Sequence, residues 1–281
     1  MDRPLYKYCD HRGIDVLDRL RLKVTPPNRF NDPFEFTPQM QELSSETALR
    51  YVLDEDAMRE IYPKLMQGGQ FSGSFAAFRH EIGRRSPTLA KRLIETYPEI
   101  AEQLRRGFID MISQTLGVIC LSSVNDDILM WGHYTDSHTG MVIGFAREHD
   151  FWHHPELQPV DCATNRAIFD PSIEPDDPKR QLQTRAIVRC KSSHWAYEQE
   201  WRQLRLLAAC VEESDGDNIN YYVSIPPNLI SCVIVGCRFS IKNRFTLETI
   251  LSRREFAHVD LQQAHLDDRE FRLALKTMTN R

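Results

Sequence analysis

The sequence predicts an α+β fold, a twisted and mostly antiparallel sheet with a helical insertion subdomain at residues 41–116. Short apolar runs typical of strands lie on both sides of a segment that has helical periodicity. Neither residues 1–40 nor residues 117–281 close a sheet alone. We therefore expect residues 1–281 to fold as a single α+β domain.

The N-terminal part predicts a strand, a helix and a second strand. Residues 4–9 (PLYKYC) form the first strand, and residues 15–22 carry apolar side chains at near-helical spacing. Residues 22–25 are predicted to form the second strand. It ends at Pro26-Pro27, which opens a loop over residues 26–36.

The next segment predicts amphipathic helices at 45–61, 72–84 and 87–116. Ser86-Pro87 has the pattern of a helix start, with Ser as the N-cap and Pro at the first helical position. The polar positions of this segment look solvated. We expect it to pack as a subdomain over one side of the sheet and to contribute few residues to any pocket.

The C-terminal part is rich in strand signals. Compact apolar runs at 117–122, 141–145 and 186–190 predict buried strands, and residues 195–207 alternate with a period of two. Further predicted elements are strands at 220–225 and 230–236, a helix at 240–254, and short strands near 257–263 and 270–276. Residues 155–185 contain prolines at intervals and predict a long irregular loop.

The composition is that of an ordinary globular protein. Of 281 residues, 41% are hydrophobic and 27% charged, which excludes disordered, collagen-like and coiled-coil chains. No apolar run approaches the length of a membrane span, and the N-terminus lacks the apolar region of a signal peptide, so we expect a cytoplasmic protein that does not bind membranes. The net charge of −5 implies no general attraction to nucleic acid. Seven scattered cysteines without a C-x-x-C pair argue against zinc and disulfides.

Four polar clusters interrupt these apolar or aromatic segments. In the first, residues 31–35 (NDPFE), Asp32 and Glu35 either belong to an ordinary turn or present carboxylates to a ligand. In the second, His133 and Tyr134 stand between a helix and a buried strand. His133 and His138 are five residues apart, which does not suit a metal site on one helix face.

The third cluster is Glu198, Glu200 and Arg202, which share one face of an alternating strand. Either this face is solvated, or the arginine pairs with one carboxylate and leaves the other for chemistry. The fourth cluster is Tyr6-Lys7-Tyr8 on the first strand. We predict one common pocket around Asp32, His133, Tyr134, Glu198, Glu200 and Arg202.

Five motifs carry a family resemblance. LYKY, PNRFNDPFE, CLSSVNDDILMWGHYTDSHTGMVIGF, KSSHWAYEQEWR and IPPNLISCVIVG occur in this order along nearly the whole chain. Together they resemble the bacterial domain-of-unknown-function 2971 (DUF2971) family. That resemblance implies a shared fold and no particular activity.

A looser resemblance is to ADP-ribosyltransferase-like folds. Tyr6-Lys7-Tyr8, then Ser122 or Tyr134, then Glu198-x-Glu200 occur in the order of the functional residues of such folds. The resemblance implies a glutamate that stabilises the oxocarbenium-like centre formed as nicotinamide leaves NAD, and aromatic rings that stack on nicotinamide. The implied catalytic residues are Glu200, Glu198, His133 and Tyr134, and the implied ligand-binding residues are Tyr6, Lys7, Tyr8, Asn31, Asp32, Ser122 and Arg202.

Three functions stay open at this point. The first is an NAD-handling ADP-ribosyltransferase or glycohydrolase, in phage defence or stress response, that takes NAD as its substrate. The second is a non-catalytic ligand-binding or interaction module of a defence system. The third is a metal-dependent nuclease whose magnesium or manganese ligands would be Asp32, Glu35, Asp126, Asp127, Glu198 and Glu200.

The role of Arg202 decides between the two glutamates. If Arg202 only braces the strand, Glu200 is structural and Glu198 is the better catalytic candidate. If Arg202 binds a phosphate of the ligand, Glu200 is the free carboxylate. We favour the second case, because the arginine fork matches a diphosphate.

Overall fold

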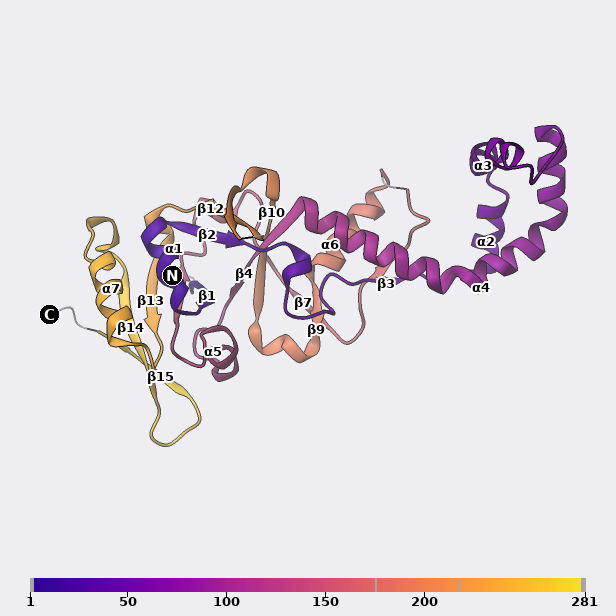
Figure 1. The fold of residues 1–281 in the computed structure, drawn as a ribbon. Helices are drawn as coiled ribbons and strands as arrows, with labels where there is room; N and C mark the ends of the chain where they lie inside the picture. The colour runs from indigo at the N-terminus through magenta and orange to yellow at the C-terminus, as the bar shows by residue number, and fades with distance from the viewer. Residues whose placement is uncertain (1–2, 175, 217, 279–281) are drawn as a thin grey trace. The chain divides into compact units, whose positions relative to one another are not determined.

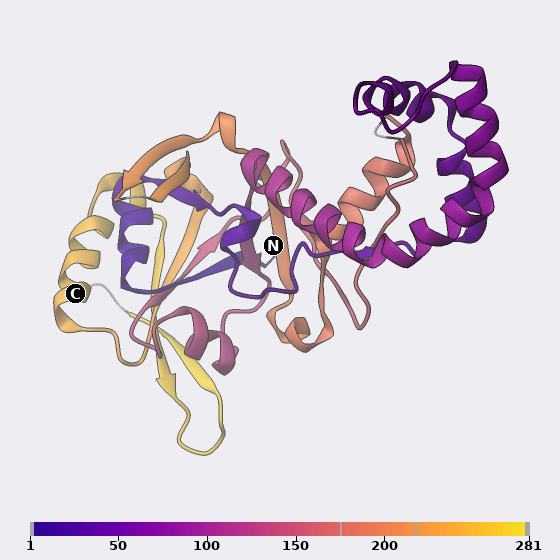
Figure 2. The ribbon, with the colours of Figure 1, turned by 45° about the vertical axis from the view of Figure 1, so that its right-hand side comes forward.

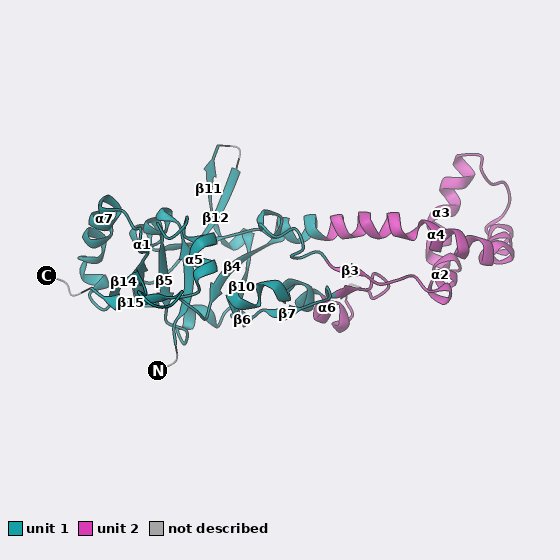
Figure 3. Ribbon diagram, turned by 90° about the horizontal axis from the view of Figure 1, so that it is seen from below, with its two compact units in different colours: residues 1–37, 109–167, 184–281 teal, residues 38–108, 168–183 magenta. Residues whose placement is uncertain are grey.

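A computed structural model describes residues 3–174, 176–216 and 218–278, and the chain divides into two compact units (Figure 3). Unit 1 is assembled from residues 1–37, 109–167 and 184–281. Unit 2 contains residues 38–108 and 168–183. That the segments flanking the helical region fold as one domain, and that the helical segment covers one side of the sheet, stay predictions.

Unit 1 contains an eight-stranded sheet (Figure 1). In spatial order its strands are β15 (Leu273–Thr277), β14 (Asp260–Leu266), β13 (Ile230–Val235), β5 (Met141–Phe145), β1 (Leu5–Cys9), β4 (Leu116–Ser122), β10 (Glu200–Leu206) and β6 (Gln158–Pro159). Every neighbouring pair is antiparallel except β13 and β14, which are parallel. The predicted α+β fold with a mostly antiparallel sheet is thus confirmed.

The described residues also form three smaller sheets. They are β11 (Val211–Asp215), β12 (Asn218–Ser224) and β2 (Arg21–Val24); β3 (Gln39–Met40) with β8 (Ile168–Phe169); and β7 (Asp161–Ala163) with β9 (Cys190–Ser192). The last two pairs are parallel, and the β3–β8 pair belongs to unit 2.

The helices differ between the units. Unit 1 holds α1 (Ile14–Arg19), α5 (Ile128–Tyr134) and α7 (Ile241–Leu251); unit 2 holds α2 (Ser45–Val52) and α3 (Glu55–Gln67); α4 (Phe75–Thr115) and α6 (Pro178–Arg189) each have residues in both. Short 3-10 helices are η1 (His11–Gly13), η2 (Pro27–Arg29), η3 (Asp150–Trp152), η4 (Ser193–Glu198), η5 (Leu207–Ala209), η6 (Pro227–Leu229) and η7 (Arg254–Phe256). Among the described residues, no helix is long and apolar enough to cross a membrane.

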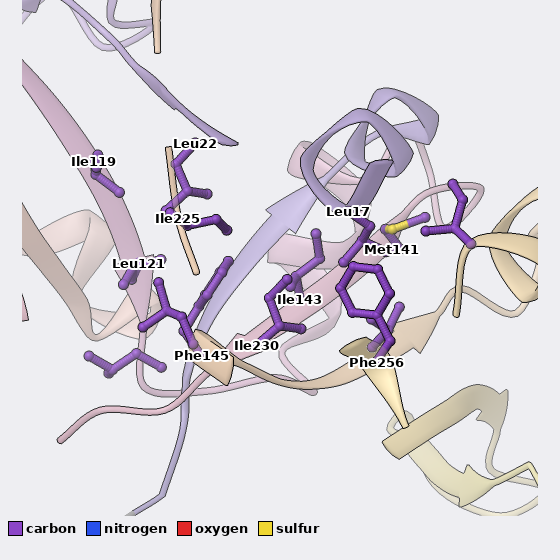
Figure 4. Packing of buried hydrophobic residues seen from close by; sticks show 14 of the residues in the cluster. Leu17, Leu22, Ile119, Leu121, Met141, Ile143, Phe145, Ile225, Ile230 and Phe256 are labelled. Carbon is purple, nitrogen blue, oxygen red and sulfur yellow. The ribbon is translucent and has the colours of Figure 1, made fainter. Parts of the chain in front are cut away.

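Strand β5 explains how the sheet is buried on both faces. All five of its residues are buried, and alternate side chains enter different cores. Met141, Ile143 and Phe145 join the larger core on one face (Figure 4). Val142 joins a smaller core on the other face, with Trp131 of α5. Helix α7, drawn in gold in Figure 2, contributes its buried Leu247 and Ile250 to the larger core.

The predicted helix start at Ser86-Pro87 is wrong, because α4 runs unbroken through both residues and through Pro98. Proline lacks the amide that would bond the carbonyl four residues earlier, which is the carbonyl of Gly83. The Ser86 hydroxyl donates to that carbonyl at 2.9 Å and replaces the missing bond. The Ser-Pro pair is therefore accommodated inside the helix.

Two predicted strands also need correction. Residues 186–189 are the end of helix α6, since a short apolar run does not distinguish a buried helix from a buried strand. Residues 195–198 lie in η4, and the strand begins only at Glu200, after Gln199 adopts a left-handed backbone with φ of 44°. The segment 155–185 contains β6, β7, β8 and the first part of α6, so it is more regular than its prolines indicated.

Candidate functional site

A small cavity opens in unit 1 where strands β1 and β4 separate. Strand β1 pairs with β5 at five positions but with β4 only at Tyr6 opposite Ser122. Beyond that pair the Lys7 ammonium reaches across and donates to the Cys120 carbonyl at 3.3 Å. The cavity has a volume of about 150 Å³ and is lined by Tyr6, Lys7, Tyr8, Phe30, Asn31, Glu35, Cys120, Leu121, Ser122, Met130, Tyr134, Lys191, Glu198 and Glu200.

Three of these residues form a row across adjacent strands. Tyr6 on β1 lies opposite Ser122 on β4, which in turn lies opposite Glu200 on β10. Residues directly opposite one another point to the same face of a sheet, so the three side chains share the cavity face. Ser122 also ties this row to Glu198, because its hydroxyl donates to the Glu198 carbonyl at 2.6 Å.

Part of the cavity wall is a buried charge cluster of Glu35, Lys191, Glu198, Glu200 and Arg202, of which all but Arg202 line the cavity. No side chain in it is more than 6% exposed. The Lys191 ammonium lies 2.5 Å from a Glu198 oxygen, 2.8 Å from Glu200 and 3.5 Å from Glu35. One cation therefore joins three carboxylates that come from a loop, a 3-10 helix and a strand.

Arg202 uses all of its nitrogens inside the protein. Its Nε and Nη2 donate to the two oxygens of Glu200 at 2.7 and 3.0 Å. Its Nη2 also donates to Glu35, and its Nη1 donates to the Val188 carbonyl at 3.0 Å near the end of α6. Carbonyls in the last turn of a helix lack helical partners, so α6 supplies an acceptor that the guanidinium satisfies.

The cluster shifts the pKa values of its carboxyl groups in opposite directions. Burial disfavours the charge on Glu200, but the charges and hydrogen bonds of Arg202 and Lys191 outweigh it and lower the pKa to about 2. For Glu35 burial dominates over Arg202 and Lys191, and its pKa is raised. Glu35 is thus the more readily protonated of the two. With all three carboxylates ionised, the cluster carries one more negative than positive charge.

Tyr134 lines the same cavity and is hydrogen-bonded to the cluster. Its hydroxyl donates to Glu198 Oε1 at 2.6 Å, while Lys191 contacts the other oxygen. Burial and then the hydrogen bond and charge of Glu198 raise the pKa of Tyr134, so its hydroxyl remains a donor. Tyr8 donates to the Val124 carbonyl at 3.1 Å, and burial raises its pKa as well.

The predicted site residues fall into two groups. Those that line the cavity are Tyr6, Lys7, Tyr8, Asn31, Ser122, Tyr134, Glu198 and Glu200. His133 is exposed, with its ring 6.3 Å from that of Tyr134. Asp32 is buried and holds its own loop, since it accepts from the Trp195 indole at 2.7 Å and the Phe34 amide at 2.9 Å. All described residues that line the cavity lie outside 41–116.

The alternative of a solvated sheet face for Glu198, Glu200 and Arg202 is wrong, because all three are buried. Glu198 lies in η4 and not on the strand, yet its carboxylate meets that of Glu200 through Lys191. The favoured role of Arg202 also needs correction. Each of its three nitrogens donates to Glu200, Glu35 or the Val188 carbonyl, so it braces the strand.

Sequence reasoning missed Lys191, the centre of the cluster. The residue stands inside the quoted motif KSSHWAYEQEWR, but nothing local distinguishes it from a surface lysine. The carboxylates could have indicated that such a cation exists, because buried carboxylates require a cation nearby. Glu35 was noted as a carboxylate only; its partner Arg202 is 167 positions away.

The carboxylates are not arranged as metal ligands. Within the described ranges, no group of three or more His, Cys, Asp or Glu residues could hold a metal ion. Asp127, one of the acidic residues considered for metal binding, caps α5 by accepting from the amides of Leu129 and Met130, both at 2.9 Å. The carboxylates of the charge cluster face Lys191 and Arg202 instead.

Comparison with known protein families gives a match over part of the chain. Residues 130–203 match the family described as Protein of unknown function (DUF2971). No curated protein and no solved structure matches the chain. The resemblance to ADP-ribosyltransferase-like folds therefore stays a prediction. The predicted resemblance to the DUF2971 family is confirmed, over the segment that supplies Tyr134, Lys191, Glu198 and Glu200 to the cavity.

Proposed function

We propose that this protein is an NAD-handling enzyme of the ADP-ribosyl type, a transferase or glycohydrolase. The observation that carries the proposal is the row of Tyr6, Ser122 and Glu200 across β1, β4 and β10, with the Glu198 carboxylate on the same cavity. An aromatic residue, a hydroxyl and a glutamate pair thus converge from three separate parts of the chain.

The size and lining of the cavity suit a nicotinamide ring. A volume of about 150 Å³ is the size that accommodates a single benzene-like ring. Tyr6, Tyr8, Phe30 and Tyr134 contribute aromatic walls, which can stack on or pack edge-to-face against such a ring. The rest of a dinucleotide would lie outside this cavity.

The charge of the cluster suits the reaction. As the bond to nicotinamide breaks, positive charge develops on the ribose, and fixed negative charge in a water-poor site stabilises it. The cluster has an excess of one negative charge when its three carboxylates are ionised. Its buried ion pairs hold that charge in a fixed position before the substrate arrives.

Glu198 is the better catalytic candidate, because Arg202 braces Glu200. The Glu198 carboxylate has about four acceptor positions, of which Tyr134 and Lys191 use two. It can therefore accept a hydrogen bond from a ribose hydroxyl without losing either partner. Glu200 then serves to position Lys191 and the strand.

The proposed reaction breaks the bond between C1′ of the ribose and N1 of nicotinamide. Nicotinamide leaves with the bonding electron pair, and the oxygen of water or of an acceptor forms the new bond to C1′. That oxygen loses its proton to solvent. With water, one NAD⁺ and one H₂O give nicotinamide, ADP-ribose and H⁺.

A second candidate is a non-catalytic ligand-binding module. It is favoured by one observation, that the carboxylates of the cluster already have protein partners. Such a module would bind NAD or a related nucleotide without turnover.

Nicotinamide release from NAD⁺ tests the proposal, measured by liquid chromatography with and without a cell extract as a source of acceptors. We expect the wild type to release nicotinamide and Glu198→Gln to be slower by about 100-fold, the scale for losing one preorganised electrostatic contact. Glu248→Gln, an exposed change on α7, is the matched control. Tryptophan fluorescence checks that each variant is folded.

Full activity of Glu198→Gln would refute the assignment. Binding of NAD⁺ without any release would favour the ligand-binding module. A role in defence or stress response predicts growth arrest on expression, caused by NAD loss and abolished by Glu198→Gln.

A further inference from the structure

A second, larger cavity adjoins the first. It is an open cleft of about 790 Å³ in unit 1, and it shares Lys7, Tyr8 and Tyr134 with the smaller cavity. Five cationic side chains line it, and we call it the basic cleft: Lys7, Arg12, Arg21, Lys23 and Arg29. The function proposed above gives these cations no role, although Lys7 lines both cavities.

Two of the five cations are neutralised within the protein. Arg12 pairs with Asp10 at 2.5 Å, and Arg21 pairs with Asp15 at 2.9 Å. Arg21 also pairs with Glu213 and lies over the ring of Tyr222, 3.8 Å from its centre. These two arginines therefore shape the wall of the cleft.

The other three cations have no carboxylate within ion-pair distance among the described residues: Lys7, Lys23 and Arg29. Within the described part of the chain, the side chains of Lys7 and Arg29 donate only to backbone carbonyls, of Cys120 at 3.3 Å and of Ile219 at 2.6 Å. Carbonyl oxygens leave a full positive charge on each side chain. Asp215 is the remaining acidic residue of the lining.

Lys23 lies close enough to Arg29 and Lys7 to be affected by their charges. Partial burial, then the charges of Arg12 and Arg29, and more weakly that of Lys7, lower the pKa of Lys23 despite Asp215. Like charges that line one cleft disfavour one another unless an anion offsets them. The arrangement is thus complementary to a ligand that brings concentrated negative charge.

Neutral donors complete the cleft. Asn218 and Asn220 occupy alternate positions of β12, so they point to the same face of that strand, and both line the cleft. Amide side chains and cations together are the groups that bind phosphate oxygens.

We propose that the basic cleft binds the diphosphate of a dinucleotide whose ring enters the adjoining small cavity. The identity of the ring rests on the proposed function, whereas the diphosphate rests on the cations of the cleft alone. A nucleic acid backbone is the less suitable occupant, because the chain as a whole carries a net charge of −5.

Calorimetric titration of the full chain with ADP-ribose tests this inference, since ADP-ribose has the diphosphate but no nicotinamide. We expect Lys23→Gln and Arg29→Gln each to weaken binding by about tenfold, the loss of one charge-assisted contact. The matched control Lys242→Gln removes an exposed lysine of α7 and leaves the affinity unchanged. Nicotinamide riboside, which has no phosphate, should bind equally to the wild type and to Lys23→Gln.

Unchanged ADP-ribose affinity in Lys23→Gln, or no binding of ADP-ribose to the wild type, would overturn the inference. So would tighter binding of a DNA or RNA oligonucleotide that depends on the same two side chains. ADP-ribose could bind in a way that depends on Lys23 although no nicotinamide is released from NAD⁺. That result would support the inference about the cleft and refute the proposed reaction.

Discussion

The two units contain the same ion-pair geometry in opposite environments. In unit 1, Nε and Nη2 of Arg202 donate hydrogen bonds to the Glu200 carboxylate at 2.7 and 3.0 Å. In unit 2, the same two nitrogens of Arg84 donate hydrogen bonds to the Glu81 carboxylate at 3.1 and 2.8 Å. The arginine side chain is 1% exposed in the first pair and 67% exposed in the second.

The difference shows that solvent exposure, more than geometry, determines how much an ion pair contributes to stability. An exposed pair contributes little, because water competes for both partners and salt screens them. A buried pair is costly to form and still more costly to break, because removal of one partner leaves a charge without water. The network around Arg202 therefore fixes structure at the cavity, whereas the pairs on the helices of unit 2 cover a solvated face.

Removal of the buried cation should have the largest effect. We expect Arg202→Met to lower the free energy of unfolding by about 3–5 kcal/mol, because it leaves Glu35 and Glu200 with Lys191 alone. Urea unfolding followed by tryptophan fluorescence measures it, since all four tryptophans lie in unit 1. The double variant Arg202→Met, Glu200→Met should recover part of the loss. A loss below about 1 kcal/mol would mean that burial does not distinguish the two pairs.

The pH dependence of stability separates Glu200 from Glu35. The pKa of Glu200 is about 2 in the folded protein against an ordinary 4.5, so its stabilisation is complete above pH 4.5. It is lost as the pH falls from 4.5 through 2, by up to about 3 kcal/mol. The raised pKa of Glu35 has the opposite sign, because the folded state binds that proton more readily.

Acid unfolding of two variants, followed by tryptophan fluorescence, checks this. Glu200→Gln should flatten the loss of stability as the pH falls from 4.5 towards 2. Glu35→Gln should instead remove the gain in stability that the wild type shows as the pH falls to 4.5, and leave the limb below pH 4.5 unchanged. If stability depended on acid pH in the same way in both variants, the pKa values of Glu200 and Glu35 would not be shifted in opposite directions.

Removal of the exposed cation should have the smallest effect. We expect Arg84→Met to leave the urea midpoint unchanged, measured by circular dichroism at 222 nm because unit 2 is helical and has no tryptophan. Added salt should make no difference to that comparison. If Arg84→Met shifted the urea midpoint as much as Arg202→Met does, burial would not explain the difference between the two ion pairs.

The candidate site was only partly predictable from the sequence. The order of Tyr6, Ser122 and Glu198-x-Glu200 indicated residues that do line one cavity, because polar groups within apolar strands are conspicuous. His133 looked equivalent to Tyr134, but a helix turns neighbouring side chains by about 100° and only Tyr134 faces the cavity. Asp32 was indistinguishable from a ligand-facing carboxylate until its partner Trp195 was known.

The sequence by itself determined the elements whose patterns are local, such as the buried strand β5 and the capped helix α7. It also determined the α+β class, since apolar periodicity requires no knowledge of distant partners. Only the tertiary structure decided whether residues 186–189 were helix or strand, and which cations meet which carboxylates. Lys191 joins Glu35, Glu198 and Glu200 because the fold places them within 3.5 Å in a buried site. Ion pairing depends on distance and burial in space, and sequence spacing encodes neither for residues far apart in the chain.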